Sequence, residues 1–197
     1  MPATIAKWAA DVPEDFRFTF KIFKGLTHNR GLVFEQDTIR HFMEAVQAVG
    51  DKRACLLMQF PASVKIAQLP MLQRLVSALA ADGLARGWDI ALEFRHASLY
   101  TEQLDKLLRH YGIGLVVHDK PGAPPMSDFH PNFSYLRLHG PGGNYRGSYA
   151  DEILYEYAGY VAEWLRSDKR VYVYFNNTMG RANANLERLR DFVIKLL

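Results

Sequence analysis

The feature that most constrains the fold of this 197-residue chain is a regular alternation of short apolar runs with longer amphipathic stretches. In most of these runs, apolar residues occupy both the odd and the even positions, so both faces of the strand are apolar. This pattern is typical of strands in a parallel sheet that is covered on both sides. Six strands are predicted in this way, at residues 16–24, 54–60, 89–94, 113–118, 133–139 and 170–176.

Apolar residues at helical spacing between these runs predict the helices. The predicted helices lie at residues 36–48, 69–81, 97–111, 148–165 and 181–196. Ser148 and Asp151 have the spacing of a capping box, which predicts the start of the fourth helix. Residues 1–12, with Ile5 and Trp8 at helical spacing, predict the tail of a further helix that ends at Pro13.

The alternation of strand and helix favours a TIM-like β/α barrel. No linker rich in Pro, Gly or Ser divides the chain, so residues 1–197 are expected to form one domain. The one long connection without a helical pattern is the Pro-rich segment 120–126, which continues to Pro131. We expect this segment to form a loop over one rim of the barrel.

Composition excludes several classes of protein. The formal charge is +3 and charges of both signs are interleaved, so neither nucleic acid nor a membrane surface is expected as a partner. No segment has the length of a membrane span and no leader pattern opens the chain, so the cytoplasm is the expected location. The one cysteine, Cys55, excludes a disulfide framework and is expected to be a buried, unreactive thiol.

Polar side chains gather at the carboxyl ends of most of the predicted strands, where the loops of β/α proteins carry the chemistry. We predict Glu93, His118 and His139 as catalytic residues. The predicted substrate-binding residues are Lys24, His28, Gln59, Arg95, Asp119, Arg137, Tyr145, Arg146, Asn176 and Asn177.

These side chains suggest a division of roles. Glu93 or His139 is the expected acid/base, Arg95 and Arg137 are the expected anion clamp, and Asn176 is the expected orienting group. The backbone amides of the Gly-rich loop 140–148, together with the helix that follows it, could cradle a phosphate or carboxylate.

Structural roles remain open as alternatives. Glu93 could form a purely structural ion pair with Arg95 or with Arg137. The asparagines at 176 and 177 could bond only to loop backbone, as asparagine often does at turns. The tyrosines at 145, 149, 172 and 174 are expected to pack with satisfied hydroxyl groups, and His118 and His139 could be hydrogen-bonded residues of the rim.

Several short motifs in a fixed order resemble the YecE-like family, also called domain of unknown function 72, from Pro13 to the C-terminus. The motifs are Thr27–His28, Gln59–Pro61, Glu93–His96, Tyr135–Gly140, Tyr145–Tyr149 and Tyr172–Asn177. The resemblance implies a TIM-like barrel of unestablished biochemical function. Members of that family usually begin with a strand that carries a Ser-Gly-Trp motif and a second strand that carries a Glu and an Asn.

This sequence has neither of those two motifs, so the resemblance implies a barrel that lacks its first two strands and shows six βα units. Three outcomes stay open: a partner or swapped segment closes the gap, the sheet stays open, or the chain is a truncated derivative. An open sheet edge normally needs a cover, and a second copy of the chain is one candidate for it.

The sequence thus favours an enzyme that handles a small polar or anionic substrate, such as a phosphorylated or sugar-like compound. A non-catalytic binding or interaction module and a metal-assisted hydrolase are the alternatives. No Walker, dinucleotide-binding or zinc-ribbon pattern is present, so no cofactor and no metal ligand are assigned.

Overall fold

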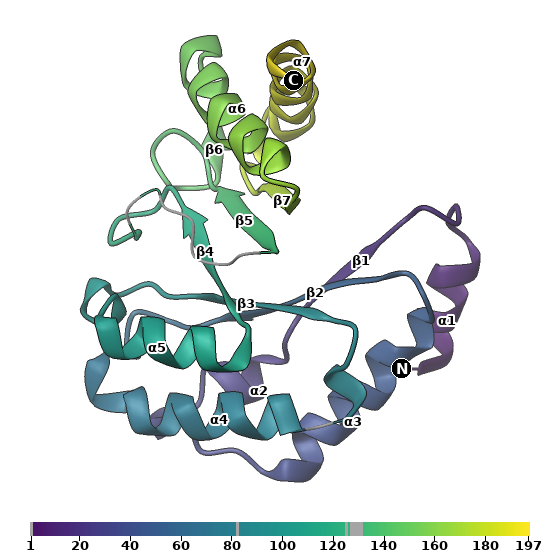
Figure 1. Cartoon of the computed structure of the whole chain (residues 1–197), viewed down its shortest axis with the longest axis vertical. Coiled ribbons are helices and arrows are strands. Elements are labelled where there is room, and N and C mark those ends of the chain that lie inside the picture. Colours follow the sequence, from purple (N-terminus) through teal and green to yellow (C-terminus); the bar gives the residue numbers. More distant parts are fainter. Residues whose placement is uncertain (1, 82, 125, 127–131) are drawn as a thin grey trace. The chain divides into compact units, whose positions relative to one another are not determined.

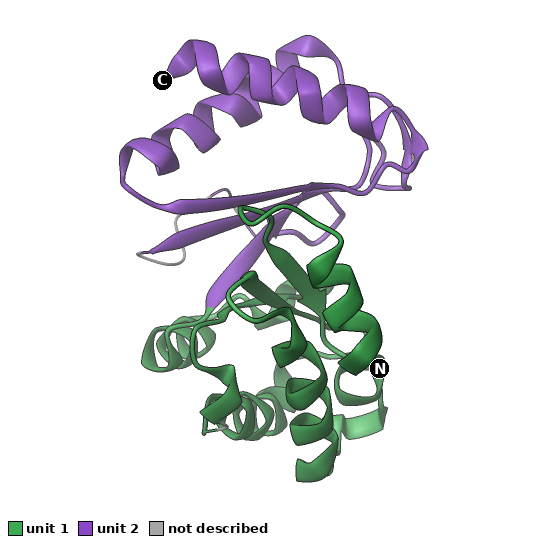
Figure 2. Ribbon diagram, turned by 90° about the vertical axis from the view of Figure 1, so that its right-hand side faces the viewer, with its two compact units in different colours: residues 1–113 green, residues 114–197 purple. Residues whose placement is uncertain are grey.

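The structure is a computed structural model that describes residues 2–81, 83–124, 126 and 132–197. The chain divides into two compact units, residues 1–113 and residues 114–197 (Figure 2). Each unit contains a parallel sheet of three strands and the helices that accompany it, with these elements labelled in Figure 1. The α/β class with parallel strands that the sequence predicts is therefore confirmed.

The first unit contains a parallel sheet in the order β1, β2, β3. Its strands are β1 (Phe18–Lys21), β2 (Arg53–Gln59) and β3 (Asp89–Glu93). Its helices are α1 (Pro2–Ala10), α2 (Lys24–Thr27), α3 (Gln36–Val46), α4 (Leu69–Ala81) and α5 (Glu102–Tyr111). Short 3-10 turns lie at Arg30–Leu32, Gln47–Val49, Ile66–Gln68, Gly83–Ala85 and Ala97–Leu99.

In this unit β2 and β3 are buried on both faces, whereas β1 is only partly buried. Every residue of β2 between its two ends is buried, as the apolar residues at both alternating positions predict. The helix α4 buries Leu72, Leu75, Val76 and Leu79, which recur at the spacing of one helical face. Cys55 is fully buried, as expected.

The predicted helix 97–111 is interrupted in the structure. A 3-10 turn at Ala97–Leu99 comes first, and α5 begins only at Glu102. Thr101 has an extended backbone and its hydroxyl accepts a hydrogen bond from the N–H of Leu104 at 3.3 Å, so it caps a new helix and cannot lie inside a longer one.

The first strand is shorter than the predicted 16–24. The backbone N–H of Ile22 still bonds to the carbonyl of Leu57 at 2.8 Å, but the chain then leaves the sheet and Lys24 opens the helical turn α2. Lys24 therefore lies in a helical turn and not at the end of a strand. The apolar alternation continues past the point where pairing ends, so the sequence pattern overestimates the strand.

The second unit contains a parallel sheet in the order β4, β5, β7. Its strands are β4 (Gly114–His118), β5 (Phe133–Leu138) and β7 (Arg170–Phe175), and its helices are α6 (Asp151–Arg166) and α7 (Ala182–Leu196). Two dipeptides, β6 (Arg146–Gly147) and β8 (Met179–Gly180), also pair in parallel. The core is formed by buried side chains of the sheet and of both helices, including Leu136, Leu138, Leu154, Ala158 and Leu189.

The predicted capping box at Ser148 and Asp151 is wrong. Ala150 occupies the cap position of α6, and no side chain caps this helix. The hydroxyl of Ser148 instead accepts a hydrogen bond from Nδ2 of Asn185 at 2.9 Å. A partner 37 positions away in the chain takes the hydroxyl, and a local pattern cannot reveal such a partner.

Residues 125 and 127–131 of the Pro-rich segment lie outside the described residues, so the predicted rim loop is described only at its start, where the N–H of Ala123 closes a turn onto the carbonyl of Lys120 at 3.1 Å. Among the helices of the described ranges, none combines the length and the hydropathy that crossing a bilayer requires.

Candidate functional site

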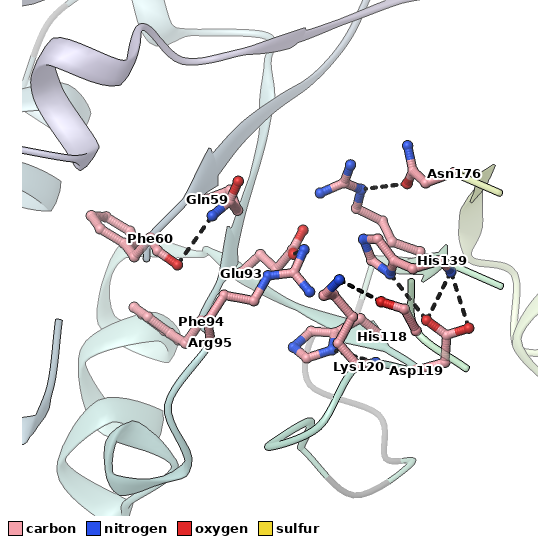
Figure 3. A network of polar contacts seen from close by, with 12 residues as sticks. Gln59, Phe60, Glu93, Phe94, Arg95, His118, Asp119, Lys120, His139 and Asn176 are labelled. Carbon is pink, nitrogen blue, oxygen red and sulfur yellow. Dashed lines mark hydrogen bonds and ion pairs between the residues drawn. The ribbon is translucent and has the colours of Figure 1, made fainter. Parts of the chain in front are cut away.

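In the first unit, the predicted site residues of β2 and β3 lie side by side. Gln59 and Glu93, the last residues of the two strands, are register partners in the sheet. Glu93 and Arg95 form an ion pair, and the side chain of Glu93 is fully buried while that of Arg95 is 13% exposed (Figure 3). Burying a carboxylate is unfavourable without a countercharge, and Arg95 supplies one.

The charge of Glu93 acts on a neighbouring phenol that the sequence interpretation did not select. Burial raises the pKa of the Tyr100 hydroxyl well above its usual value, the charge of Glu93 adds to this effect, and Arg95 partly opposes it. The hydroxyl donates to the carbonyl of Phe94 at 3.2 Å. Tyr100 is therefore a hydrogen-bonding phenol beside the Glu93–Arg95 pair.

Basic side chains lie where β1 ends. Nζ of Lys21 donates to Oε1 of Gln59 at 2.7 Å. Nε2 of Gln59 donates to the carbonyl of Phe60 at 3.2 Å (Figure 3). Partial burial lowers the pKa of His28, and the charges of Lys21 and then Lys24 lower it further. Lys21 is therefore a further candidate beside the predicted residues Gln59, Lys24 and His28. The sequence analysis did not select it because it lies within a strand pattern.

In the second unit, three hydrogen bonds join Asp119 and His139. The carboxylate accepts the backbone N–H of His139 at 2.8 and 3.0 Å, and Oδ1 also bonds to ring Nδ1 at 3.0 Å (Figure 3). Asp119 follows β4 and His139 follows β5, so the carboxyl ends of neighbouring parallel strands bring them together. The ring of His139 is fully buried and the side chain of Asp119 is 11% exposed.

A third residue, Tyr149, completes this contact. Its hydroxyl donates to Oδ2 of Asp119 and accepts the backbone N–H of Gly140. Burial by itself disfavours the charged carboxylate, but the hydrogen bonds from the His139 ring, Tyr149 and the His139 backbone outweigh it and lower the pKa of Asp119. Burial and the bond to Asp119 raise the pKa of Tyr149 well above its usual value.

The hydrogen bond to Asp119 assigns the tautomer of His139. A carboxylate with a lowered pKa is an acceptor, so Nδ1 of His139 carries the proton and Nε2 is the basic nitrogen of the neutral ring. His118 has the opposite arrangement, because its Nδ1 accepts the N–H of Lys120 at 3.2 Å. The two rings are perpendicular and their centroids are 6.2 Å apart.

Tyr145 packs against the ring of His139. Its ring meets that of His139 edge to face at 5.5 Å, and Nζ of Lys120 lies 4.1 Å from its centroid. The same ammonium group donates to the carbonyl of Gly143. Lys120 was not selected from the sequence, and a lysine next to the strand-end pair His118–Asp119 was the signal that could have found it.

Arg137 is held by a second predicted residue. Its Nε donates to Oδ1 of Asn176 at 3.1 Å, and the backbone N–H of Asn176 bonds to the carbonyl of Leu138 at 2.6 Å. Asn176 thus fixes the plane of the guanidinium group at the carboxyl ends of β5 and β7. The aromatic ring of Tyr135 stacks on that of Tyr174 at 5.2 Å, on the same two strands.

Asn177 and Arg146 are placed differently from the other predicted residues. Asn177 is fully buried, and its Nδ2 donates to the carbonyl of Gly147 at 2.9 Å and to Oδ1 of Asn185 at 3.0 Å. Asn185 also accepts the N–H of Tyr149 at 3.3 Å. These bonds tie the Gly-rich loop to α7, which is a structural use of Asn177. Arg146 is exposed in the β6–β8 pair.

The backbone of the Gly-rich loop is largely committed to bonds within the unit. The N–H groups of residues 140, 143, 145 and 146 bond to Tyr149, Gly140, His139 and Asn144 respectively. These four amides therefore donate to acceptors within the unit and are not directed toward a possible anion. Within the described parts of the chain, no group of three or more His, Cys, Asp or Glu side chains is arranged to hold a metal ion.

Comparison with known proteins gives a consistent result. The chain is 22% identical over 123 residues to the UPF0759 protein YecE of Escherichia coli, in an alignment that covers 60% of this chain and 43% of that protein. The matched region therefore spans less than half the length of this curated relative.

Two solved structures share the fold. A DUF72 family protein of Enterococcus faecalis superimposes with a TM-score of 0.82, at 22% identity, over 98% of this chain and 80% of that chain. A DUF72 family protein of Thermotoga maritima superimposes with a TM-score of 0.78, at 26% identity, over 99% of this chain and 78% of that chain. The family model described as "Protein of unknown function DUF72" matches residues 1–195, so the chain belongs to the DUF72 family, as its sequence motifs predict.

Proposed function

We propose that this protein is an enzyme that acts on a small polar or anionic substrate by acid/base chemistry, with His139 exchanging the proton and Asp119 orienting it. The contact that carries this proposal is the double hydrogen bond between the Asp119 carboxylate and the backbone and ring of His139. A carboxylate bonded to Nδ1 fixes the imidazole and stabilises its protonated form, so Nε2 is prepared to take up and return a proton.

Anionic substrate groups are contacted by arginine in this proposal. Arg137 lies at the carboxyl end of β5, one position before the strand's last residue, and Asn176 fixes its orientation. A guanidinium group held in one plane is suited to two parallel hydrogen bonds from a carboxylate or phosphate. Phosphorylated and sugar-like compounds are therefore the first substrate classes to screen.

We propose that access to His139 involves a movement of Tyr145. The His139 ring has no exposed surface, whereas the side chain of Tyr145, which packs against it, is 40% exposed. We propose that substrate enters where the Tyr145 ring lies, with Lys120 released from that ring to meet the anion. Lys120, Tyr145 and Arg137 then contact the substrate, and His118 lines the same region.

The first unit supplies the second proposed group of site residues. Glu93, with Arg95 as its countercharge, is proposed as a further acid/base, and Lys24, His28 and Gln59 as substrate contacts. The ion pair at the end of β3 and the basic side chains at the end of β1 support these roles.

An activity screen on phosphorylated sugars and related esters tests the enzyme proposal. We expect His139→Gln to lower kcat by about 10²-fold or more, the range of a lost general acid/base. His110→Gln, on the exposed end of α5, is the matched control and should keep full activity. Full turnover in both His139→Gln and Glu93→Gln would refute the assignment of either residue as acid/base.

We propose a TIM-like β/α barrel with six βα units for the architecture. Parallel strands joined by helices within each unit support it, as does the likeness to the two DUF72 structures over 98% and 99% of the chain. A crystal structure of the protein tests this arrangement directly.

A second candidate function is self-association through the first unit. A groove of about 310 Å³ between α1, β1 and α3 is lined mainly by apolar residues, and two of them, Trp8 and Phe23, are 51% and 52% exposed. An exposed apolar surface of this kind is typical of an interaction site. Light scattering after size exclusion should then report a dimer that Trp8→Ser dissociates, whereas Ile194→Ser, at an exposed site on α7, leaves it intact.

A further inference from the structure

Three basic side chains follow one another where β1 ends. Lys21 is the last residue of β1, Lys24 is the first residue of α2, and His28 ends that helical turn. The backbone N–H of His28 donates to the carbonyl of Lys24 at 2.8 Å, so the two residues stand one helical turn apart. Residues at this spacing project from the same face of a helical turn.

The ammonium group of Lys21 is oriented by Gln59. Its Nζ donates to Oε1 of Gln59 at 2.7 Å. The other end of the Gln59 amide donates to the carbonyl of Phe60 at 3.2 Å, which fixes which atom of the amide faces Lys21. Gln59 is therefore a positioning residue for a positive charge.

The ring of His28 is oriented by a hydrogen bond to Thr27. Its Nδ1 shares a hydrogen bond of 2.7 Å with the hydroxyl of Thr27, a residue that is fully buried. This bond directs Nε2 away from Thr27. After partial burial, the charges of Lys21 and Lys24 are the causes that lower the pKa of His28, which indicates that both ammonium groups act on this ring. The three side chains therefore share one region of positive potential.

We propose that Lys21, Lys24 and His28 bind the phosphate group of a phosphomonoester ligand. Three donors from the end of a strand and the two ends of a helical turn suit a tetrahedral dianion, which presents three terminal oxygens in different directions. All three residues are solvent-exposed. This inference rests on the proposed function, because it names phosphomonoesters as the substrate class of the proposed enzyme.

Inorganic phosphate, followed by NMR of the histidine ring protons, tests this site without any enzymatic reaction. We expect saturable shifts of the His28 resonances and a rise in the pKa of His28 at high phosphate, because a bound dianion stabilises the imidazolium. Lys21→Gln and Lys24→Gln should each weaken phosphate binding by roughly threefold to tenfold, the range for charge-assisted hydrogen bonds at a surface. Lys106→Gln, an exposed lysine paired with Glu102 on α5, should leave it unchanged.

Chloride and acetate test whether the effect is binding of phosphate at a specific site or only screening of surface charge by salt. Sodium chloride at equal ionic strength should not shift the His28 resonances in a saturable way, and acetate should bind more weakly than phosphate. Equal effects of chloride and phosphate, or unchanged phosphate binding in the Lys21→Gln and Lys24→Gln double variant, would overturn the proposal. Circular dichroism of each variant establishes that it is folded.

The same experiment distinguishes this inference from the proposed enzyme. His139→Gln should bind inorganic phosphate as the unmodified protein does, because His139 belongs to the other unit and to the acid/base step. Phosphate binding together with no turnover of any phosphorylated or sugar-like compound would remove the enzyme and keep the site. Turnover of an uncharged sugar with no phosphate binding would remove the site and keep the enzyme.

Discussion

Asp119 and His139 are joined through both the backbone and the ring of the histidine, with the N–H at 2.8 Å and Nδ1 at 3.0 Å from Oδ1. The carboxylate therefore fixes the position of the chain at the end of β5 and the orientation of the ring at once. Removing it should disturb both, which separates Asp119 from a residue that only orients a side chain.

We predict that Asp119→Asn lowers stability in a pH-dependent way. Hydrogen bonds hold the pKa of Asp119 below its usual value, so its charge stabilises the folded state above the unfolded-state pKa of about 3.9, and this contribution is lost as pH falls through the lower folded pKa. Urea unfolding should show a deficit of about 1–3 kcal/mol at pH 7 that shrinks below about pH 4. A deficit that stays constant from pH 7 to pH 3 would contradict the role of the charge.

Tyr149→Phe should destabilise the fold by about 1–3 kcal/mol, because it leaves the Gly140 N–H and one oxygen of Asp119 without the hydroxyl. The pKa of Asp119 should rise in this variant, since one of the bonds that lower it is gone. Tyr155→Phe is the control: its side chain is 51% exposed on α6 and its ring contacts Phe192. Equal unfolding free energies for the two variants would show that the Tyr149 hydroxyl is not a structural partner.

The sequence predicted the elements better than their ends, and the reason is visible at particular residues. Burial on both faces makes β2 recognisable, whereas the end of β1 depends on where pairing with Leu57 stops. The start of α5 depends on Thr101, a local cap that a run of helical spacing conceals. Ser148 was misread because its partner, Asn185, is remote in sequence.

The candidate site, too, could be predicted only in part from the sequence. Strand-end polar residues identified His139, Asp119 and Arg137, because the register of parallel strands alone brings such positions together. Tyr149 was expected to pack with a satisfied hydroxyl group, and it is buried with its hydroxyl bonded to Asp119 and Gly140. Its partner Asp119 was not predicted, because nothing in the sequence pairs a tyrosine with a carboxylate 30 positions away. The β6–β8 pair was missed for a related reason, because two strands of two residues each leave no periodic signal.

Two glycines should respond to alanine in opposite ways. At Gly140 the backbone has a φ of +99°, and an added Cβ would clash with the carbonyl oxygen of Arg146, so Gly140→Ala should cost more than about 2 kcal/mol. At Gly159, inside α6, an added Cβ meets nothing within 4 Å, so Gly159→Ala should stabilise by about 0.5–1 kcal/mol. Thermal unfolding measures both, and a stabilised Gly140→Ala variant would contradict the loop geometry.

We predict that the buried ion pair of Glu93 and Arg95 stabilises the fold. Glu93 has no exposed side-chain surface, so Glu93→Gln leaves the guanidinium of Arg95, which is 13% exposed, without its countercharge. Breaking one side of a buried pair is costly, and we expect a loss of roughly 3 kcal/mol in the free energy of unfolding. Glu102→Gln provides the matched control, because Glu102 pairs with Lys106 on an exposed face and such pairs contribute little. If urea unfolding gives the two variants the same stability, the charge of Glu93 is not required for folding, and its burial is then better explained by catalysis than by packing.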